Sequence, residues 1–139
     1  FGAYFQIFAY LRQRPSGMAF RPAQPFLLSR PDCTIRVPDV AYVEAHRLAL
    51  HDWNAPLCEA APDLIVEVLT DLDRMEEVLL RINDFMHAGT SMAWLLDGEE
   101  ESITVMRRNG SRVFRNHEKV RAAPLLPWLN YCTSEFFGK

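Results

Sequence analysis

The stretch Leu64-Ile65-Val66-Glu67-Val68-Leu69 is a continuous apolar run that contains one acidic residue. Such a run is typical of a central strand that is covered on both faces of a sheet. Burying an unpaired carboxylate costs several kcal/mol, so Glu67 needs either a partner or a proton. Strand periodicity places Asp63, Ile65, Glu67 and Leu69 on one face. We therefore expect the partner of Glu67 on that face.

The residues after this run predict a helix and then another strand. Apolar residues recur at helical spacing from Met75 to Met86, and Gly89 follows them. Asp73 with Glu76 has the pattern of a capping box, which marks the start of a helix. The apolar run from Met92 to Leu96 then predicts a strand that ends at an Asp97-Gly98 turn.

Shorter elements are expected on both sides of this unit. The spacing of apolar residues predicts a helix over Phe1 to Leu11, and residues 44–62 have no sustained period and predict a loop with one helical turn. Residues 124–137 form an apolar tail. The expected strands are an antiparallel meander over Met18 to Arg21, Phe26 to Ser29, Thr34 to Val37 and Asp39 to Val43, and a hairpin of Ile103 to Met106 with Val113 to Arg115 around Asn109-Gly110.

Length and composition indicate one domain over residues 1–139. The chain has 139 residues with 49% hydrophobic content, which is enough for one core. Neither a membrane-spanning apolar run nor a secretory signal occurs, and three widely spaced cysteines without a CxxC pair favour a cytoplasmic location. The first residues already have the pattern of a helix interior, so we expect the chain to be truncated at its N-terminus.

Charge is distributed unevenly along the chain, although the net charge is only −3. Residues 50–101 hold thirteen acidic residues against two arginines, whereas residues 102–121 hold six cations against Glu118 alone. The overall charge argues against a protein that coats nucleic acid. The basic segment is either a solvated hairpin or a surface that faces phosphates.

Asp39 is the natural candidate for the partner of Glu67, because it opens an apolar strand directly after Pro38. Two neighbouring carboxylates repel unless a proton or a hard cation such as Mg²⁺ lies between them. The alternative is purely structural. In that interpretation Asp39 caps a turn after Pro38, and Glu67 forms a buried salt bridge with an arginine such as Arg36 or Arg81.

Several motifs, taken in order, resemble one known family. They are Val37-Pro38-Asp39-Val40-Ala41-Tyr42-Val43, then residues 61–70 with Asp63 and Glu67, then Asp73-Arg74, then Phe85 through Ala88-Gly89 to Trp94-Leu95-Leu96-Asp97, and finally Leu126-Pro127-Trp128-Leu129 with Phe136-Phe137. This series is similar to the putative restriction endonuclease family, a branch of the PD-(D/E)XK nuclease superfamily. The resemblance covers the chain from about residue 17 onward. It implies an α/β (α+β) restriction-endonuclease-like fold, in which a central mixed β-sheet is flanked by helices.

The resemblance also implies the site residues. Asp39 and Glu67 would be metal-binding acids, and the backbone carbonyl of Val68 would be the third ligand of Mg²⁺ or Mn²⁺. The superfamily pattern has a lysine two residues after the glutamate, but Leu69 stands there. This family carries its lysine on the following helix, where this chain has Arg81. Arginine stays protonated at physiological pH and cannot act as a base, but it can stabilise charge on a phosphate.

We therefore expect a divalent-metal-dependent endonuclease that hydrolyses phosphodiester bonds of DNA, with Asp39, Glu67 and Arg81 as catalytic residues. A homodimer that turns two sites toward two strands fits this activity, and no membrane partner is expected. The alternative is a catalytically impaired or inactive member of the fold that acts as a binding or assembly module. A small-molecule hydrolase is disfavoured, because no Ser/His or Cys/His arrangement occurs in recognisable context.

Other residues could carry chemistry, but each has a simpler interpretation. His46, His51 and Cys58 lie close in sequence, yet a structural zinc site usually has four ligands with paired spacings. His87 is expected near the end of its helix, where a cation complements the helix dipole. Trp94 and Trp128 are expected in the core. Trp53, in the polar loop, is the better candidate for an exposed aromatic side chain that stacks on a base.

Overall fold

The computed structural model describes residues 7, 9–12, 17–20, 23–29, 32–70 and 75–138. Residues 9–12 are helical, and α2 (Met75–Ala88) is the long helix of the described part. None of the helices described is long and apolar enough to cross a membrane. The other elements are β1 (Gly17–Ala19), β2 (Phe26–Ser29), β3 (Thr34–Arg36), β4 (Val40–Glu44), η1 (Ala45–Arg47), β5 (Leu64–Leu69), β6 (Met92–Asp97), β7 (Ser102–Arg107), β8 (Gly110–Arg115) and η2 (Thr133–Phe137).

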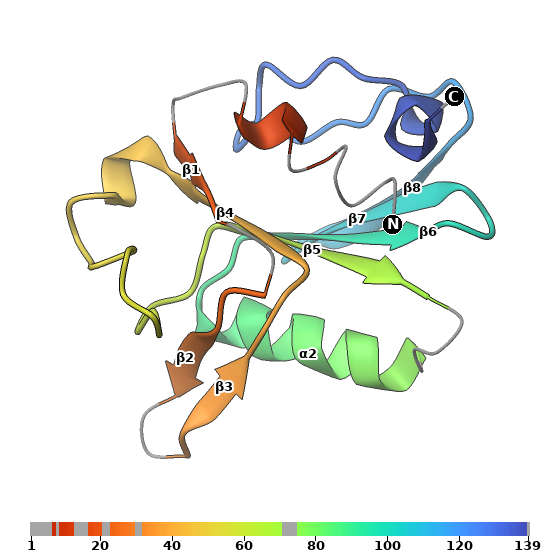
Figure 1. Ribbon diagram of the computed structural model, residues 1–139. Helices are drawn as coiled ribbons and strands as arrows, with labels where there is room; N and C mark the ends of the chain where they lie inside the picture. The colour runs from red at the N-terminus through yellow and green to blue at the C-terminus, as the bar shows by residue number, and fades with distance from the viewer. Residues whose placement is uncertain are drawn as a thin grey trace.

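A six-stranded mixed sheet with the order β1-β4-β5-β6-β7-β8 forms the centre of the molecule (Figure 1). The pair β5 and β6 is parallel, and the other neighbours in this sheet are antiparallel. Parallel strands need a crossover connection, which α2 provides between β5 and β6. The expected mixed sheet with flanking helices is thus confirmed, and β5 is its covered central strand.

Each face of the sheet is covered by different parts of the chain. Figure 1 shows α2 and the small β2–β3 sheet on one face, and the helical residues near the N-terminus with the C-terminal segment on the other. Successive side chains of β5 point alternately to these two faces of the sheet. Leu64 and Val66 belong to the core on the C-terminal side, whereas Ile65 packs in the core on the α2 side with Val78, Ile82 and Phe85. Glu67 has the same parity as Ile65, so it faces α2.

The predicted meander of antiparallel strands is wrong in its connectivity. β1 pairs with β4, while β2 and β3 pair with each other in a separate two-stranded sheet, and Phe26 of β2 also forms an isolated bridge with Cys58. Pro25 precedes β2 and lacks the N–H that would continue a ladder. Phe26 is fully buried and packs its ring edge against Phe85 of α2, 5.9 Å between centroids. This contact draws the hairpin out of the main sheet and against the helix.

Most of the remaining predicted elements are confirmed. The strand over Met92 to Leu96 is β6, the hairpin around Asn109-Gly110 is β7 with β8, and residues 45–47 form one helical turn in the predicted loop. The helix predicted after Asp73 is α2, and His87 lies in its last turn as expected. Asp73 of the proposed capping box and residues 1–6 of the predicted N-terminal helix lie outside the described residues.

Candidate metal-binding site

The register of β4 and β5 brings Asp39 beside Glu67. Val40 pairs with Val66 in this antiparallel ladder, so continuing it by one residue sets Asp39 opposite Glu67. Side chains at directly opposite positions project from the same face, with Cβ atoms about 4.5–5.5 Å apart. Val66 belongs to the core on the C-terminal side, so Glu67, the next residue of β5, faces α2. The two acids singled out from the sequence therefore lie at neighbouring positions, with Glu67 in β5 and Asp39 directly before β4.

The Asp39 carboxylate accepts a hydrogen bond from β5 just beyond the last backbone pair between β4 and β5. The main-chain N–H of Val68 donates to Asp39 Oδ2 at 2.7 Å. A side-chain oxygen thus takes the position of a backbone acceptor, which fixes the orientation of Asp39 relative to β5. Asp39 itself is only half buried, as is Val68. The acid is held in place at the rim of the sheet and is within reach of solvent.

Glu67 is 2% exposed, and its charge is balanced from α2. Arg81 Nη2 donates to Glu67 Oε1 at 2.6 Å, and Arg81 Nε donates to the same oxygen at 3.0 Å. The Arg81 side chain is 29% exposed, so it covers the carboxylate from the solvent side. Of the two arginines considered for this salt bridge, Arg36 instead binds Asp84, with Nε 2.9 Å from Oδ2.

A lysine at position 69 would lie on the same face as Glu67, but Leu69 fills that position and packs against the core on the α2 side. Among the described residues, Arg81 contacts Glu67 and so places a positive charge beside the acid pair. Two carboxylates and a main-chain carbonyl at Val68 would make an all-oxygen donor set. Mg²⁺ and Mn²⁺ prefer such ligands, so the residues present fit a hard divalent cation.

Asp63, another buried acid, lies directly before the first residue of β5, at the opposite end of the strand from Val68. Its Oδ2 accepts the N–H of Glu44 at 2.7 Å, and its Oδ1 accepts from Arg47 Nη1 at 2.9 Å. Arg47 in turn lies over the ring of Trp53, 5.2 Å from the centroid, and its carbonyl accepts the indole N–H. Asp63 therefore anchors the loop after β4 to the sheet.

This anchoring corrects the expectation for Trp53, which is 3% exposed and belongs to the core on the α2 side. The indole is buried because the loop folds over the sheet edge, so it is no platform for a base. Trp94 is buried as expected.

Cys58 is also buried in this loop, and burial raises the pKa of its thiol, with Asp52 adding to the effect. His46 lies at the surface beside Glu44. No group of three or more His, Cys, Asp or Glu side chains is gathered in the described part of the chain.

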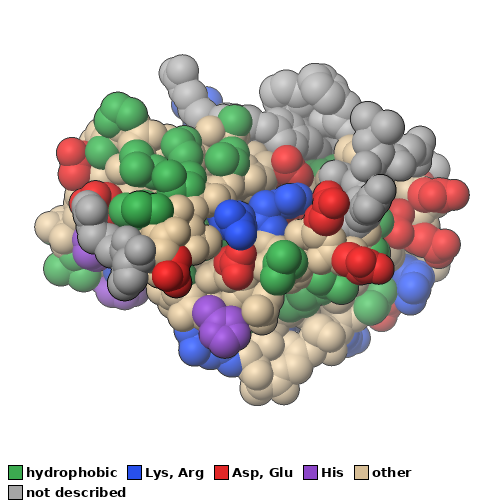
Figure 2. All heavy atoms as spheres, turned by 90° about the horizontal axis from the view of Figure 1, so that it is seen from below, with side chains coloured by type: hydrophobic (Ala, Val, Ile, Leu, Met, Phe, Trp, Pro, Cys, Tyr) green, Lys and Arg blue, Asp and Glu red, His purple; other side chains and the backbone are tan. Residues whose placement is uncertain are grey.

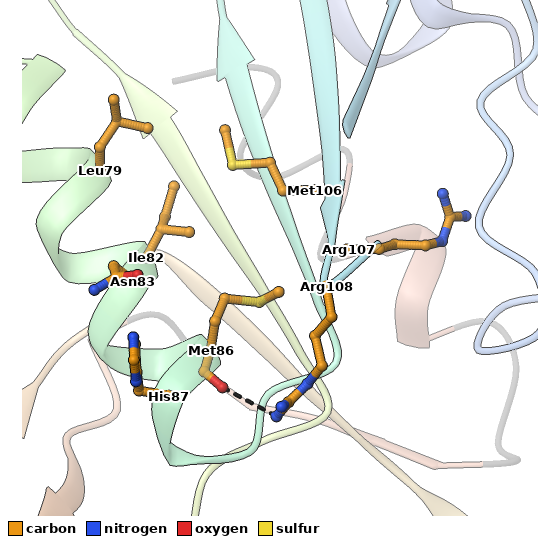
Figure 3. A pocket seen from close by; sticks show the side chains of 8 residues that line it. All are labelled: Leu79, Ile82, Asn83, Met86, His87, Met106, Arg107 and Arg108. Carbon is orange, nitrogen blue, oxygen red and sulfur yellow. Dashed lines mark hydrogen bonds between the residues drawn. The ribbon is translucent and has the colours of Figure 1, made fainter. Parts of the chain in front are cut away.

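A pocket of about 450 Å³ lies between α2 and β7. Figure 3 shows Leu79, Ile82 and Met86 of the helix facing Met106 of the sheet, with the Arg108 guanidinium at one end, where Nη2 donates to the Met86 carbonyl at 3.1 Å. Leu79 and Arg81 are two residues apart and project from nearly opposite sides of the helix. The pocket is therefore separate from the acid pair.

The basic segment lies on β7, β8 and the loop that follows, with β6 between it and β5. Arg107 donates to the carbonyls of Arg121 and Ala123, Lys119 donates to Asn130, and Arg112 lies 3.7 Å from Glu118. The face that carries α2 shows cations in its middle with acidic side chains around them (Figure 2). Among the described residues, both signs of charge therefore occur on that face.

Comparison with known proteins identifies relatives of this chain. The family model Uma2, described as "Putative restriction endonuclease", matches residues 3–133. Among solved structures, the chain is similar to a protein from Anabaena variabilis described as "a putative nuclease belonging to DUF820", with a TM-score of 0.81 and 20% identity over 99% of this chain and 80% of that chain. No curated protein matches the sequence.

Proposed function

Because the chain belongs to the Uma2 family of "Putative restriction endonuclease" proteins, we propose that it is a divalent-metal-dependent endonuclease that hydrolyses phosphodiester bonds of DNA. The observation that carries this proposal is the acid pair, in which Asp39 is held to the backbone of β5 one residue from Glu67. The nuclease description of the structural neighbour from Anabaena variabilis supports the same activity class.

In this proposal Asp39, Glu67 and the carbonyl of Val68 hold Mg²⁺ or Mn²⁺. The cation, when bound, would supply Lewis-acid chemistry and lower the pKa of a bound water. Asp39 is fixed by the Val68 N–H, so its carboxylate needs little reorganisation to act as a ligand. In the metal-free protein Glu67 is fixed by the apolar surroundings of β5 and by its contact with Arg81.

Arg81 would take a role that differs from that of the family lysine. A guanidinium keeps its proton at any physiological pH, so Arg81 cannot accept a proton from the attacking water. It can place positive charge near the oxygens of a phosphate as negative charge develops on them. We therefore expect slow hydrolysis, with the rate limited by the missing proton acceptor.

The test is cleavage of plasmid, of duplex and single-stranded oligonucleotides, and of RNA in Mg²⁺ or Mn²⁺, with EDTA as the blank. We expect DNA cleavage that requires the metal and falls at least about 100-fold in Asp39→Ala and Glu67→Ala, since each removes a metal ligand. Asp84→Asn, which breaks only the ion pair with Arg36, is the control and should cleave normally. Undiminished cleavage by both alanine variants would refute the site, and preferential cleavage of RNA would refute the substrate.

Cutting of both strands in one encounter would require two sites, as a homodimer provides. Analytical ultracentrifugation of the active protein tests that assembly. A monomer that nicks one strand at a time would contradict the dimer and leave the chemistry intact.

A second candidate is a non-catalytic member of the fold that acts as a binding or assembly module. The Arg81–Glu67 contact favours it, because this ion pair neutralises the buried carboxylate without a metal. Calorimetric titration with Mn²⁺ separates the candidates. No heat of binding together with no cleavage favours the module, whereas binding that Glu67→Gln abolishes favours the enzyme.

A further inference from the structure

Arg81 binds the Glu67 carboxylate, which is one of the proposed metal ligands. Its Nη2 and Nε groups donate to the same oxygen, Oε1 of Glu67, at 2.6 and 3.0 Å. An arginine that only balanced a buried charge could use both oxygens of the carboxylate in a parallel, bidentate arrangement. Here the guanidinium is concentrated on one oxygen of Glu67.

A divalent cation and a guanidinium compete for the same oxygens because both are attracted to the negative charge and repel each other. Glu67 is 2% exposed, so water screens this repulsion less than it does at the surface. Arginine also cannot relieve the repulsion by losing its proton, unlike a lysine at the same position.

The position of Arg81 on α2 allows it to leave. Its side chain is 29% exposed, whereas Glu67 is enclosed, so the guanidinium can swing toward solvent without moving the helix. The neighbouring ion pair between Arg36 and Asp84 joins β3 to the next turn of α2 and stays in place during such a movement. The helix is thus held while one side chain changes partner.

From these contacts we propose that Arg81 is a resident counter-ion of Glu67 that must be displaced when a divalent cation is bound, and that it thereby sets the metal affinity of the site. This inference rests on the proposed function, because it takes Glu67 as a metal ligand. It makes Arg81 a positioning residue in the metal-free protein. The wild-type protein then binds metal weakly and stays folded without it.

The experiment combines Mn²⁺ calorimetry with thermal melting, neither of which depends on cleavage. Arg81→Gln should bind Mn²⁺ at least ten-fold more tightly than the wild type. Its melting temperature should be lower than that of the wild type without metal and should rise more when Mn²⁺ is added. The double variant Glu67→Gln/Arg81→Gln replaces the ion pair with two neutral amides and should show no Mn²⁺-dependent shift.

Two further variants make the result specific. Arg36→Gln removes an equal charge from the same side of the molecule. Because Arg36 contacts Asp84 rather than Glu67, the Mn²⁺ affinity of this variant should match that of the wild type. Arg81→Lys keeps the charge with a more compact head group, and it covers the case in which Arg81→Gln does not fold. It should bind Mn²⁺ at least three-fold more tightly than the wild type.

The outcomes separate this inference from the proposed function. If Arg81→Gln and Arg81→Lys bind Mn²⁺ like the wild type while Glu67→Gln does not bind, the counter-ion role is overturned and the metal site stands. If Arg36→Gln tightens binding as much as Arg81→Gln, the effect is general electrostatics and the inference also fails. If no variant binds Mn²⁺, both the inference and the metal-dependent function are wrong.

Discussion

At the scale of single residues, two acids at β5 have different surroundings: Asp63, directly before the strand, and Glu67, within it. Both carboxylate oxygens of Asp63 are bonded within the chain, to the N–H of Glu44 and to Arg47. Glu67 is more deeply buried and forms an ion pair with Arg81, which comes from a different element. Asp63 has the bonding of a structural acid, whereas we propose that the partner of Glu67 is exchanged when a cation binds.

Asp63→Asn tests the structural role of Asp63. The amide would turn N–H donors toward groups that themselves donate, and it would leave Arg47 without its counter-charge. We expect a loss of about 3 kcal/mol in the free energy of unfolding, as for a broken buried ion pair. Urea denaturation measures it. Asp84→Asn, at the more exposed pair with Arg36, should cost about 0.5 kcal/mol, and equal losses in the two variants would contradict the assignment.

The sequence could predict that Glu67 needs a partner, but not which one. Arg36 and Arg81 were both candidates, and a single sequence does not tell which arginine lies near the strand. Helical periodicity set Arg81 at the edge of the apolar stripe of α2, beside the buried residues Val78, Ile82 and Phe85. The docking of that stripe on β5 then selected Arg81.

At the scale of elements, the unit β5-α2-β6 is predicted well from sequence because each part has a clear period. The pairing of β1 with β4 is not predicted from sequence. It joins residues about 25 positions apart, and it requires the β2–β3 hairpin to lie outside the main sheet. Local patterns show that a strand exists, but they do not show its partner. The buried Trp53 was missed for the same reason, since its burial depends on how the loop folds over the sheet.

Gly17→Ala tests the pairing of β1 with β4. A Cβ atom at Gly17 would lie 2.3 Å from the carbonyl oxygen of Val43 and 2.4 Å from the Tyr42 hydroxyl. Because Val43 belongs to the central sheet, the backbone cannot give way easily, and we expect a loss of about 2 kcal/mol from overpacking. Urea denaturation measures the loss.

Gly98→Ala is the matched control, because no heavy atom lies within 4 Å of a Cβ at Gly98. It should change the free energy of unfolding by less than about 0.5 kcal/mol. A Gly17→Ala protein as stable as Gly98→Ala would contradict the close packing of β1 against β4.

At the scale of the whole molecule, the sheet sets the acid pair apart from the other charged groups. The basic segment lies beyond β6, and the acidic turn of Glu99, Glu100 and Glu101 follows the end of β6. Glu99 and Glu100 of this turn are exposed and Glu101 is half-buried, and such a turn could also attract cations without specificity. The central claim is therefore that a divalent cation binds at Asp39 and Glu67 in preference to this turn.

Paramagnetic broadening by substoichiometric Mn²⁺ in two-dimensional ¹⁵N–¹H spectra tests this claim most directly, because it locates the cation without requiring catalysis. The amide of Val68, which is bonded to Asp39, and the amide of Val40 should broaden first, and Glu67→Gln should abolish that effect. Broadening that begins at Glu99 to Glu101 while the Val68 signal stays sharp would contradict the proposed metal site.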